Sequence, residues 1–308
     1  MAINPFMHGV LKLLSYRGSH TKLNYRIDRM IHNILHPSFK PHYKMWDHKI
    51  MVDGYELQVR DFVPEQCRSQ EIILFFHGGG WVSGNIESYT KTCMDLAKQT
   101  GRRVLSVDYR LAPEFPFPRG AEDCYRIARE LYLLTPECCA DRIILMGDSA
   151  GGNLAAAVSL MAADRSEFQV KKQILIYPST YNDHSERSPF PSIARCGKGY
   201  LLTAKKLCDY QDLYIQNKED LVSPYFAPLL ANHLESQPST LLITAEFDPL
   251  RDEGEEYAKK LMAFGSSVTI RRMKDALHGF FSLPPQFSQV KQCYRWINEF
   301  LDGVQTNE

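Results

Sequence analysis

The feature of this sequence that most constrains its fold is the alternation of short apolar runs with helix-like stretches. Runs such as IILFF (72–76) and IILM (143–146) are apolar without interruption, and amphipathic stretches separate most of them. A strand of that kind is buried on both faces, which requires helices on both sides of a mostly parallel sheet. We therefore expect an α/β fold with three layers. The apolar runs are 72–76, 104–108, 143–146, 173–177, 240–245 and 267–273, and the helix-like stretches are 88–99, 120–133, 152–163 and 253–264.

An antiparallel hairpin is expected ahead of the parallel strands. Residues 44–63 hold two β-like runs, KMWDHKIMV and YELQVRDFV. The dipeptide Asp53-Gly54 separates them, and it tolerates the positive φ angles of a tight turn. The sheet is therefore expected to begin with an antiparallel pair.

Two segments outside this alternation are expected to form a helical cap. Residues 1–43 look helical and contain no strand, and 180–222 belong to a connection far longer than an ordinary loop of an α/β unit. Thr203 is the expected N-cap of a helix in the second segment. Because such excursions often cover a site, we place both segments over the carboxyl ends of the strands. The remaining residues, 44–179 and 223–308, are expected to form the core of a single domain that spans 1–308.

Composition excludes several classes of protein. The 308 residues include 36 Lys plus Arg and 36 Asp plus Glu, so the formal net charge is zero. A nucleic-acid-binding domain usually carries a basic surplus, so no nucleic-acid partner is expected. No run of about 18 apolar residues occurs, so no segment is expected to span a membrane. The N-terminal stretch has neither a basic leader nor a small-residue cleavage site, which favours an amphipathic helix over a signal peptide.

The spacing of cysteine and histidine predicts neither disulfides nor a metal site. The eight cysteines are scattered, with no CxxC pair and no Cys/His cluster of zinc spacing, which is typical of a reduced, cytoplasmic protein. His32 and His36 stand four residues apart, but Asn33 occupies the position at which HExxH has its glutamate. We expect no metal and no cofactor.

The first motif with chemical content is Gly147-Asp148-Ser149-Ala150-Gly151, which fits GxSxG. It lies between an apolar strand and a helix rich in small residues. A serine at such a junction stands on a turn so sharp that neighbouring side chains would collide, and glycines two residues away on either side relieve the clash. Ser149 is therefore a candidate nucleophile.

A glycine-rich segment directly follows another strand. His77-Gly78-Gly79-Gly80-Trp81 comes after IILFF, and its bare backbone N–H groups suit an oxyanion formed during acyl transfer. The segment HGGGWVSGN lacks both GK[ST] and GxGxxG, which disfavours a phosphate-binding loop. Farther along the chain, Asp248 and then His278 follow Ser149, each at or just beyond the carboxyl end of a strand-like run. Serine, acid and histidine in this order are typical of α/β-hydrolases.

These motifs together resemble the hormone-sensitive-lipase-like α/β-hydrolases, in particular their bacterial short-chain carboxylesterases and acetyl esterases. The resemblance spans roughly residues 72–300 and implies the α/β-hydrolase fold, with a mostly parallel central sheet and helices on both faces. The matching segments are HGGGW (77–81), DYRLAPE (108–114), GDSAGGN (147–153), DPLRDEG (248–254) and HGF (278–280).

The resemblance also implies residue roles. Ser149 would be the nucleophile, His278 the general base and then acid, and Asp248 the carboxylate that orients the imidazole. The backbone N–H groups of Gly79, Gly80 and Ala150 would form the oxyanion hole. Residues considered for the substrate pocket are Trp81, Asp148, Phe280 and Phe281, with burial in the core as the alternative for the aromatic rings and a local hydrogen bond within the turn as the alternative for Asp148.

These assignments predict a serine carboxylesterase that hydrolyses small esters with short acyl chains through an acyl-enzyme on Ser149. An amidase, an arylformamidase-like enzyme or a lipase would use the same triad. A non-catalytic ligand receptor of the same fold is disfavoured because His278 is present. The segment PFMHGVLKLLSY (5–16) leaves docking to a lipid surface open, and the family resemblance allows a homodimer.

Overall fold

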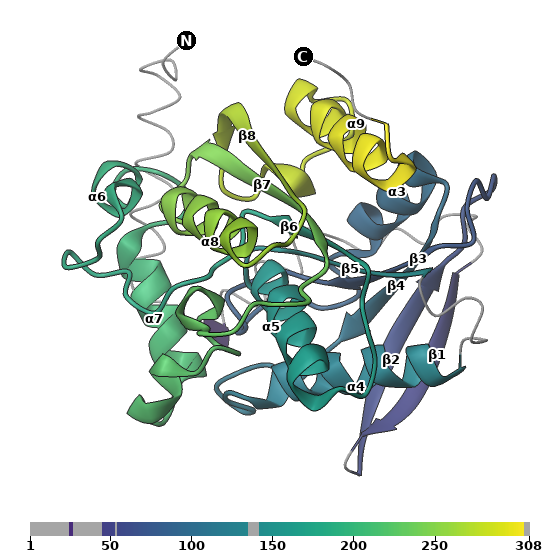
Figure 1. Cartoon of the computed structure of the whole chain (residues 1–308), viewed down its shortest axis with the longest axis horizontal. Coiled ribbons are helices and arrows are strands. Elements are labelled where there is room, and N and C mark those ends of the chain that lie inside the picture. Colours follow the sequence, from purple (N-terminus) through teal and green to yellow (C-terminus); the bar gives the residue numbers. More distant parts are fainter. Residues whose placement is uncertain (1–24, 27–44, 53, 135–141, 305–308) are drawn as a thin grey trace.

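The described part of the chain is built around an eight-stranded sheet (Figure 1). The computed structural model describes residues 25–26, 45–52, 54–134 and 142–304. The strand order is β1-β2-β4-β3-β5-β6-β7-β8. β2 pairs antiparallel with β1 and with β4, and the pairs from β4 across to β8 are parallel. The strands are β1 Met45–Val52, β2 Tyr55–Phe62, β3 Ile72–Phe76, β4 Arg103–Asp108, β5 Ile143–Asp148, β6 Lys172–Ile176, β7 Ser239–Phe247 and β8 Val268–Leu277.

Helices cover both faces of this sheet, so the predicted three-layer α/β-hydrolase fold is confirmed. α3 and α9 pack on one face, and α4, α5 and α8 pack on the other (Figure 1). The helices are α3 Thr90–Thr100, α4 Arg119–Leu134, α5 Ala150–Arg165, α6 Pro191–Cys196, α7 Ala204–Tyr214, α8 Arg251–Ala263 and α9 Ser288–Asp302, with the short 3-10 helices η2 Lys218–Val222, η3 Pro228–Leu230 and η4 Phe280–Ser282.

Side chains of the central strands alternate between two apolar cores. Along β3, Ile73 and Phe75 point into the core beneath α3 and α9, whereas Leu74 and Phe76 point into the core beneath α4, α5 and α8. All four side chains are fully buried. Each contributes about 1.5–3 kcal/mol relative to an exposed position. Because both faces are covered, the sequence of β3 is apolar at every position.

The antiparallel hairpin predicted over 44–63 is confirmed as β1 and β2. Its turn includes Gly54, which has a φ of +77°, a conformation that glycine adopts without a steric penalty. The β2–β4 pairing then joins the hairpin to the parallel part of the sheet.

Between β6 and β7 the chain leaves the sheet and forms the cap segment predicted at about 180–222. It contains α6, α7 and η2. α7 begins directly after Thr203, whose side chain accepts a hydrogen bond from the backbone N–H of Lys206 at 3.2 Å, so the predicted N-cap is confirmed. Of the N-terminal segment 1–43, only residues 25–26 are among those described.

Two elements were predicted incompletely. α9 was not expected, although Val290, Cys293, Tyr294 and Ile297 recur at helical spacing and form its buried face. β8 continues beyond the predicted end at residue 273 because the strand persists through polar positions that interrupt its apolar pattern. The pattern therefore located the strand but not its length.

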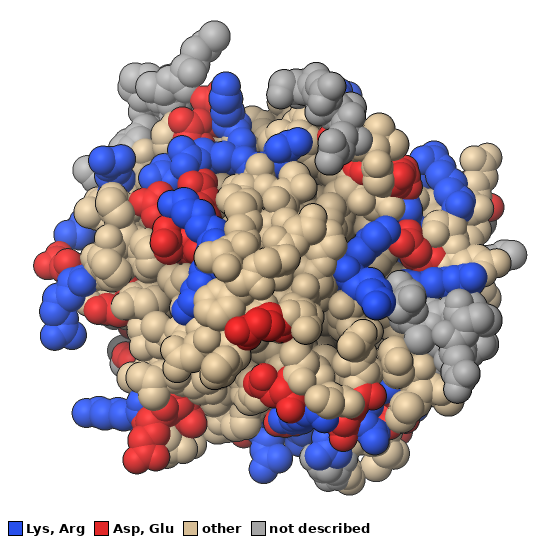
Figure 2. Space-filling view, in the orientation of Figure 1, with Lys and Arg blue, Asp and Glu red and all other residues tan. Residues whose placement is uncertain are grey.

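Charges of both signs lie side by side on the surface. On the face shown in Figure 2, Lys and Arg are interspersed with Asp and Glu. Within the described ranges, no helix is both long and apolar enough to cross a bilayer, and no cluster of three or more His, Cys, Asp or Glu residues could hold a metal. Cys67, Cys93, Cys124, Cys196, Cys208 and Cys293 are free, whereas His32, His36, Cys138 and Cys139 lie outside the described residues.

Candidate active site

Three side chains from the carboxyl ends of different strands form a hydrogen-bonded chain. Ser149 follows β5, Asp248 follows β7 and His278 follows β8. The Ser149 Oγ lies 2.8 Å from His278 Nε2, and His278 Nδ1 lies 2.7 Å from Asp248 Oδ2. Asp248 is fully buried, and its Oδ1 accepts a second hydrogen bond from the backbone N–H of Leu250 at 2.9 Å. The structure thus brings together the three residues that the motifs assigned to a triad.

The backbone at Ser149 is sharply bent, with a φ of 56° and a ψ of −120°. The chain passes so closely that the flanking glycines have no room for a side chain. A Cβ at Gly147 would lie 2.2 Å from the carbonyl oxygen of Gly151, and a Cβ at Gly151 would lie 2.0 Å from that of Phe76. The GxSxG pattern is therefore a steric requirement of this strand-to-helix turn.

The glycine loop after β3 presents backbone donors beside Ser149. Gly79 and Gly80 have φ values of +120° and +61°, and the carbonyl of Gly79 accepts a hydrogen bond from Ser83 N at 2.9 Å, which folds the loop back on itself. Among the described residues, the N–H groups of Gly79 and Gly80 make no backbone hydrogen bond. Ala150 is the first residue of α5, so its N–H has no partner within the helix. All three residues line one cavity with Ser149.

Asp148 links the turn of Ser149 to the glycine loop. Its Oδ1 accepts a hydrogen bond from the Gly78 N–H at 2.9 Å, and its Oδ2 accepts from the hydroxyls of Tyr89 at 3.1 Å and Tyr177 at 3.3 Å. Burial raises the pKa of Asp148 to about 6, and the Tyr89 hydrogen bond partly offsets that effect. Asp148 borders the same cavity as Ser149, and the sequence had offered a hydrogen bond within the turn itself as the alternative to a pocket role. The structure instead shows a bridge between distant segments, and no motif pointed to Tyr89 or Tyr177.

A cavity of about 490 Å³ lies over Ser149 and His278. Its floor is formed by the glycine loop and the turn of Ser149, and its walls come largely from the cap. The ring of Tyr210 lies directly on Gly80, because a Cβ at Gly80 would be 2.5 Å from the Tyr210 Cγ. The cap residues were not assigned to the site from the sequence. Apolar and aromatic lining residues are Trp81, Tyr89, Leu201, Leu202, Leu207, Tyr210, Leu250 and Leu283.

The pocket assignment of the aromatic residues needs correction at two positions. Trp81 borders the cavity, with most of its ring buried and stacked on Tyr214 at a centroid distance of 4.8 Å. Phe280 and Phe281 do not line the cavity. The short helix η4 turns both rings into the core beneath α3 and α9, where they are 3% and 1% exposed.

The carboxylates near Asp248 have other partners. Glu246 accepts a hydrogen bond from Asp275 N, and Asp252 pairs with Arg251. Glu253 is fully buried and pairs with His184 at 2.9 Å, which ties α8 to the start of the cap segment. Asp248 is the carboxylate that contacts the imidazole of His278.

Comparison with known proteins agrees with this geometry. The sequence matches the alpha/beta hydrolase fold family over residues 73–282. It is 37% identical over 252 residues to an arylesterase from Saccharolobus solfataricus, covering 79% of each chain. It is also 35% identical over 237 residues to an ethyl acetate hydrolase from Pseudomonas putida, covering 75% of this chain and 73% of that protein. A hyperthermophilic esterase from the archaeon Pyrobaculum calidifontis superposes with a TM-score of 0.84 at 31% identity, covering 99% of both chains.

The chain therefore belongs to the alpha/beta hydrolase family, in the group related to hormone-sensitive lipase that its motifs indicated.

Proposed function

We propose that this protein is a serine carboxylesterase and that Ser149, His278 and Asp248 are its catalytic triad. The observation that carries the proposal is the continuous hydrogen-bonded chain from Ser149 Oγ through His278 to Asp248. It lies under an apolar cavity whose floor includes the N–H groups of Gly79, Gly80 and Ala150. Esterases among its relatives support the same reaction class.

The reaction follows from the positions of these groups. The Oγ of Ser149 attacks the ester carbonyl carbon while Nε2 of His278 takes the hydroxyl proton. Asp248 holds the imidazole with Nδ1–H directed at its carboxylate and stabilises the imidazolium that forms. The same Nε2–H then protonates the leaving alcohol as the C–O bond breaks, and an acyl-enzyme remains. Water attacks that ester with the same residues in the same roles, which releases the acid and restores Ser149.

The oxyanion hole is proposed to comprise the N–H groups of Gly79, Gly80 and Ala150. These donors are fixed before the substrate arrives, so they stabilise the negative charge of the tetrahedral intermediate without reorganising. The loss of one such donor costs about 10²–10³ in kcat. The positive φ of Gly79 and Gly80 is part of this arrangement, because residues other than glycine adopt such angles only with strain.

Replacement of the nucleophile tests the assignment. The S149A variant should lose hydrolysis of p-nitrophenyl acetate by a factor on the order of 10⁶, because no acyl-enzyme can form. Its melting temperature should not fall, since alanine fits wherever serine does. Wild-type protein should show a burst of p-nitrophenol and become labelled at Ser149 by a fluorophosphonate. Turnover retained by S149A would refute the triad.

The substrate class follows from the cavity. We infer esters with short acyl chains and uncharged alcohol groups, because the walls are mainly apolar and cap side chains lie close to the catalytic serine. The names of the arylesterase and ethyl acetate hydrolase relatives support small esters. Across p-nitrophenyl acetate, butyrate, hexanoate and laurate, kcat/KM should be highest for the short chains. A maximum at laurate would favour a lipase, and faster cleavage of anilides than of matched esters would favour an amidase.

We also infer that residues 1–308 fold as one domain and that the protein is cytoplasmic, and the family resemblance allows a homodimer. The six described cysteines are free, which supports a reducing compartment. The cap segment and the sheet share the site, which supports a single unit. Light scattering of the full chain tests the dimer, and a single cooperative unfolding transition tests the single domain.

A further inference from the structure

One buried carboxylate beside the triad has no part in the proton transfers proposed above. Asp148 is 2% exposed and accepts hydrogen bonds from three donors. The donors come from three separate segments: Gly78 after β3, Tyr89 before α3 and Tyr177 after β6. The hydroxyl of Tyr89 also accepts a hydrogen bond from the Gly78 N–H at 3.1 Å. A buried charge with this set of partners needs a function that offsets its desolvation.

We propose that Asp148 is a positioning residue of the oxyanion hole, and that Tyr89 and Tyr177 hold its carboxylate in place for that purpose. This inference rests on the proposed function, because it concerns the orientation of the backbone N–H groups that form the oxyanion hole. Asp148 itself does not touch the reacting atoms. It acts through the peptide group that precedes Gly78.

The peptide groups on either side of Gly78 are both fixed. The peptide that precedes Gly78 donates its N–H to Asp148 Oδ1 at 2.9 Å. The carbonyl oxygen of the peptide that follows Gly78 lies 2.8 Å from Nδ1 of His77, and that same peptide carries the N–H of Gly79. Because a peptide group is planar, holding its carbonyl sets the direction of the Gly79 N–H. Asp148 and His77 thus clamp the start of the loop that supplies the oxyanion donors.

The packing around Gly78 leaves little freedom for this loop. A Cβ at Gly78 would lie 2.9 Å from both Asp148 Oδ2 and the Tyr89 hydroxyl oxygen. The carboxylate and the phenol therefore restrict the backbone sterically as well as through hydrogen bonds. A charged acceptor holds an N–H about twice as strongly as a neutral one, which explains why a carboxylate stands here.

The titratable neighbours of Asp148 are phenols, a thiol and one imidazole. They are Tyr89, Tyr109, Tyr177, Cys93 and His278. Burial raises the pKa of all three phenols and raises that of the Cys93 thiol to about 12, so these groups stay neutral at moderate pH. Loss of the Asp148 charge on acidification, near its pKa of about 6, therefore weakens the clamp while the phenols and the thiol are unchanged.

The first test separates an effect on the orientation of the oxyanion donors from an effect on substrate binding. Y89F removes one hydroxyl, and D148N removes the charge at nearly constant shape. Both should lower kcat about tenfold or more with KM little changed, because the contact is felt mainly in the transition state. Affinity for a trifluoromethyl ketone, which forms a tetrahedral adduct on the serine, should fall by the same factor. Y257F is the matched control, because Tyr257 is a buried tyrosine in α8 away from the cavity, and it should retain wild-type kinetics.

The second test uses the pH profile, which a merely structural role would not change. In wild type, protonation of Asp148 near its pKa of about 6 should lower kcat/KM by the factor that D148N loses at neutral pH, which appears as an added step on the acid side of the profile. D148N should lack this step. Wild-type kcat and ketone affinity in both D148N and Y89F, with the acid step retained in D148N, would overturn the inference while leaving the esterase assignment intact. Wild-type protein that cleaves no ester would overturn both. If D148N fails to fold, Y89F decides the question.

Discussion

Ser149 combines an unfavourable backbone conformation with a productive side-chain position. A non-glycine residue with a φ of 56° and a ψ of −120° costs roughly 1–3 kcal/mol. The surrounding structure tolerates this cost because the N–H of Ser149 donates to the Ile176 carbonyl at 2.9 Å and its carbonyl accepts from Asn153. The bend lets the Oγ reach His278 at 2.8 Å ahead of the first turn of α5.

The steric argument for the turn predicts the effect of a single methyl group. G151A should abolish activity and destabilise the protein by several kcal/mol, because its Cβ would lie 2.0 Å from the backbone oxygen of Phe76 and no rotamer relieves that contact. G254A is the matched control within α8. There the nearest atom would be Thr244 Cγ2 at 3.5 Å, so the variant should be neutral or slightly more stable through higher helix propensity. Chemical denaturation of both variants checks the prediction, and equal destabilisation would contradict it.

At the scale of elements, the sequence predicts what depends on local pattern and misses what depends on strand order. The proposed triad could be picked out from the sequence because each member follows a recognisable strand in a characteristic order. Tyr89 and Tyr177 could not be assigned, because they meet at Asp148 only after β3, β5 and β6 pair side by side. The contact of Tyr210 with Gly80 was likewise unpredictable, since it depends on how the cap folds over the sheet.

The position of α7 predicts that Tyr210 limits the space available to the substrate. Y210A should shift the preference of the enzyme toward longer acyl chains, because removal of the ring that lies on Gly80 opens a space next to Ser149. The ratio of kcat/KM for hexanoate to that for acetate should rise by at least about tenfold, because even one more methylene accommodated is worth roughly 1–3 kcal/mol. Y210F keeps the ring and should keep the wild-type ratio. An unchanged ratio in Y210A would place the limit elsewhere.

The cap is anchored to α8 by a buried ion pair whose strength depends on pH. The carboxylate of Glu253 contacts His184 at 2.9 Å and also accepts hydrogen bonds from the backbone N–H groups of Thr180 and Tyr181. Burial lowers the pKa of His184, but the Glu253 carboxylate, together with Gln211 and Asp183, outweighs burial and raises the pKa above the ordinary 6.5 overall. A raised histidine pKa means that folding favours the protonated form. The stabilisation is therefore complete below about pH 6.5 and is lost as pH rises through the folded-state pKa.

A double-mutant cycle with H184Q and E253Q measures this anchor. The coupling free energy should be large at about pH 5.5, where H184Q alone costs about 3 kcal/mol because it leaves Glu253 buried without its cation. It should shrink by about pH 9. The exposed pair Lys198–Glu186 serves as the control and should show no measurable coupling at either pH. Coupling that grows with pH would mean that the imidazole is neutral in the folded protein.

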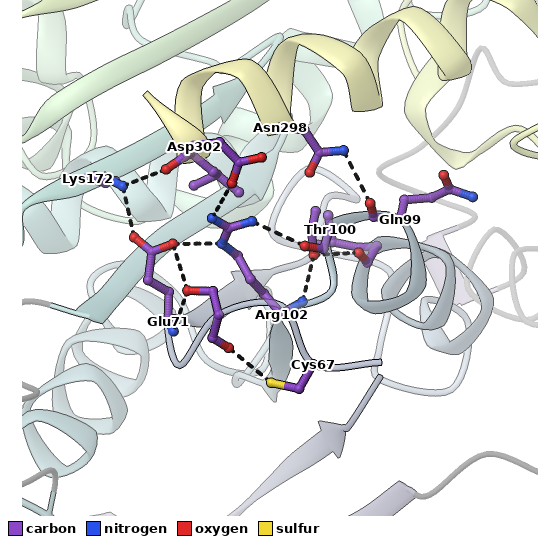
Figure 3. A network of polar contacts seen from close by, with 11 residues as sticks. Cys67, Glu71, Gln99, Thr100, Arg102, Lys172, Asn298 and Asp302 are labelled. Atoms are coloured by element: carbon purple, nitrogen blue, oxygen red, sulfur yellow. Dashed lines mark hydrogen bonds and ion pairs between the residues drawn. The ribbon is translucent and has the colours of Figure 1, made fainter. Parts of the chain in front are cut away.

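For the whole molecule, the two ends of the parallel strands have separate tasks. The carboxyl ends carry the site, and the amino ends carry a polar network that fastens the C-terminal helix to the sheet (Figure 3). Arg102 donates to Glu71 at 2.7 Å and to Asp302 of α9 at 2.8 Å, and Lys172 donates to Glu71 and to the Leu301 carbonyl. Burial raises the pKa of Glu71, but the two cations outweigh it and hold the pKa below its ordinary value. The network thus joins segments from both halves of the chain.

This separation predicts that the network affects stability without affecting catalysis. The side chain of Arg102 is 4% exposed, so R102A removes buried charge-assisted hydrogen bonds and should lower the free energy of unfolding by about 1.5–3 kcal/mol. The loss of stability should be smaller than for a buried charge left with no partner, because Glu71 keeps Lys172 as a partner. The side chain of Arg129 is 38% exposed, so its ion pairs are largely solvated. R129A should therefore change the free energy of unfolding by no more than about 1 kcal/mol. Urea denaturation gives both values, and kcat/KM of R102A measured well below its melting temperature should equal that of wild type. A fall in kcat/KM without a fall in stability would show that the amino ends of the strands communicate with Ser149, which the rigid packing of the central strands argues against.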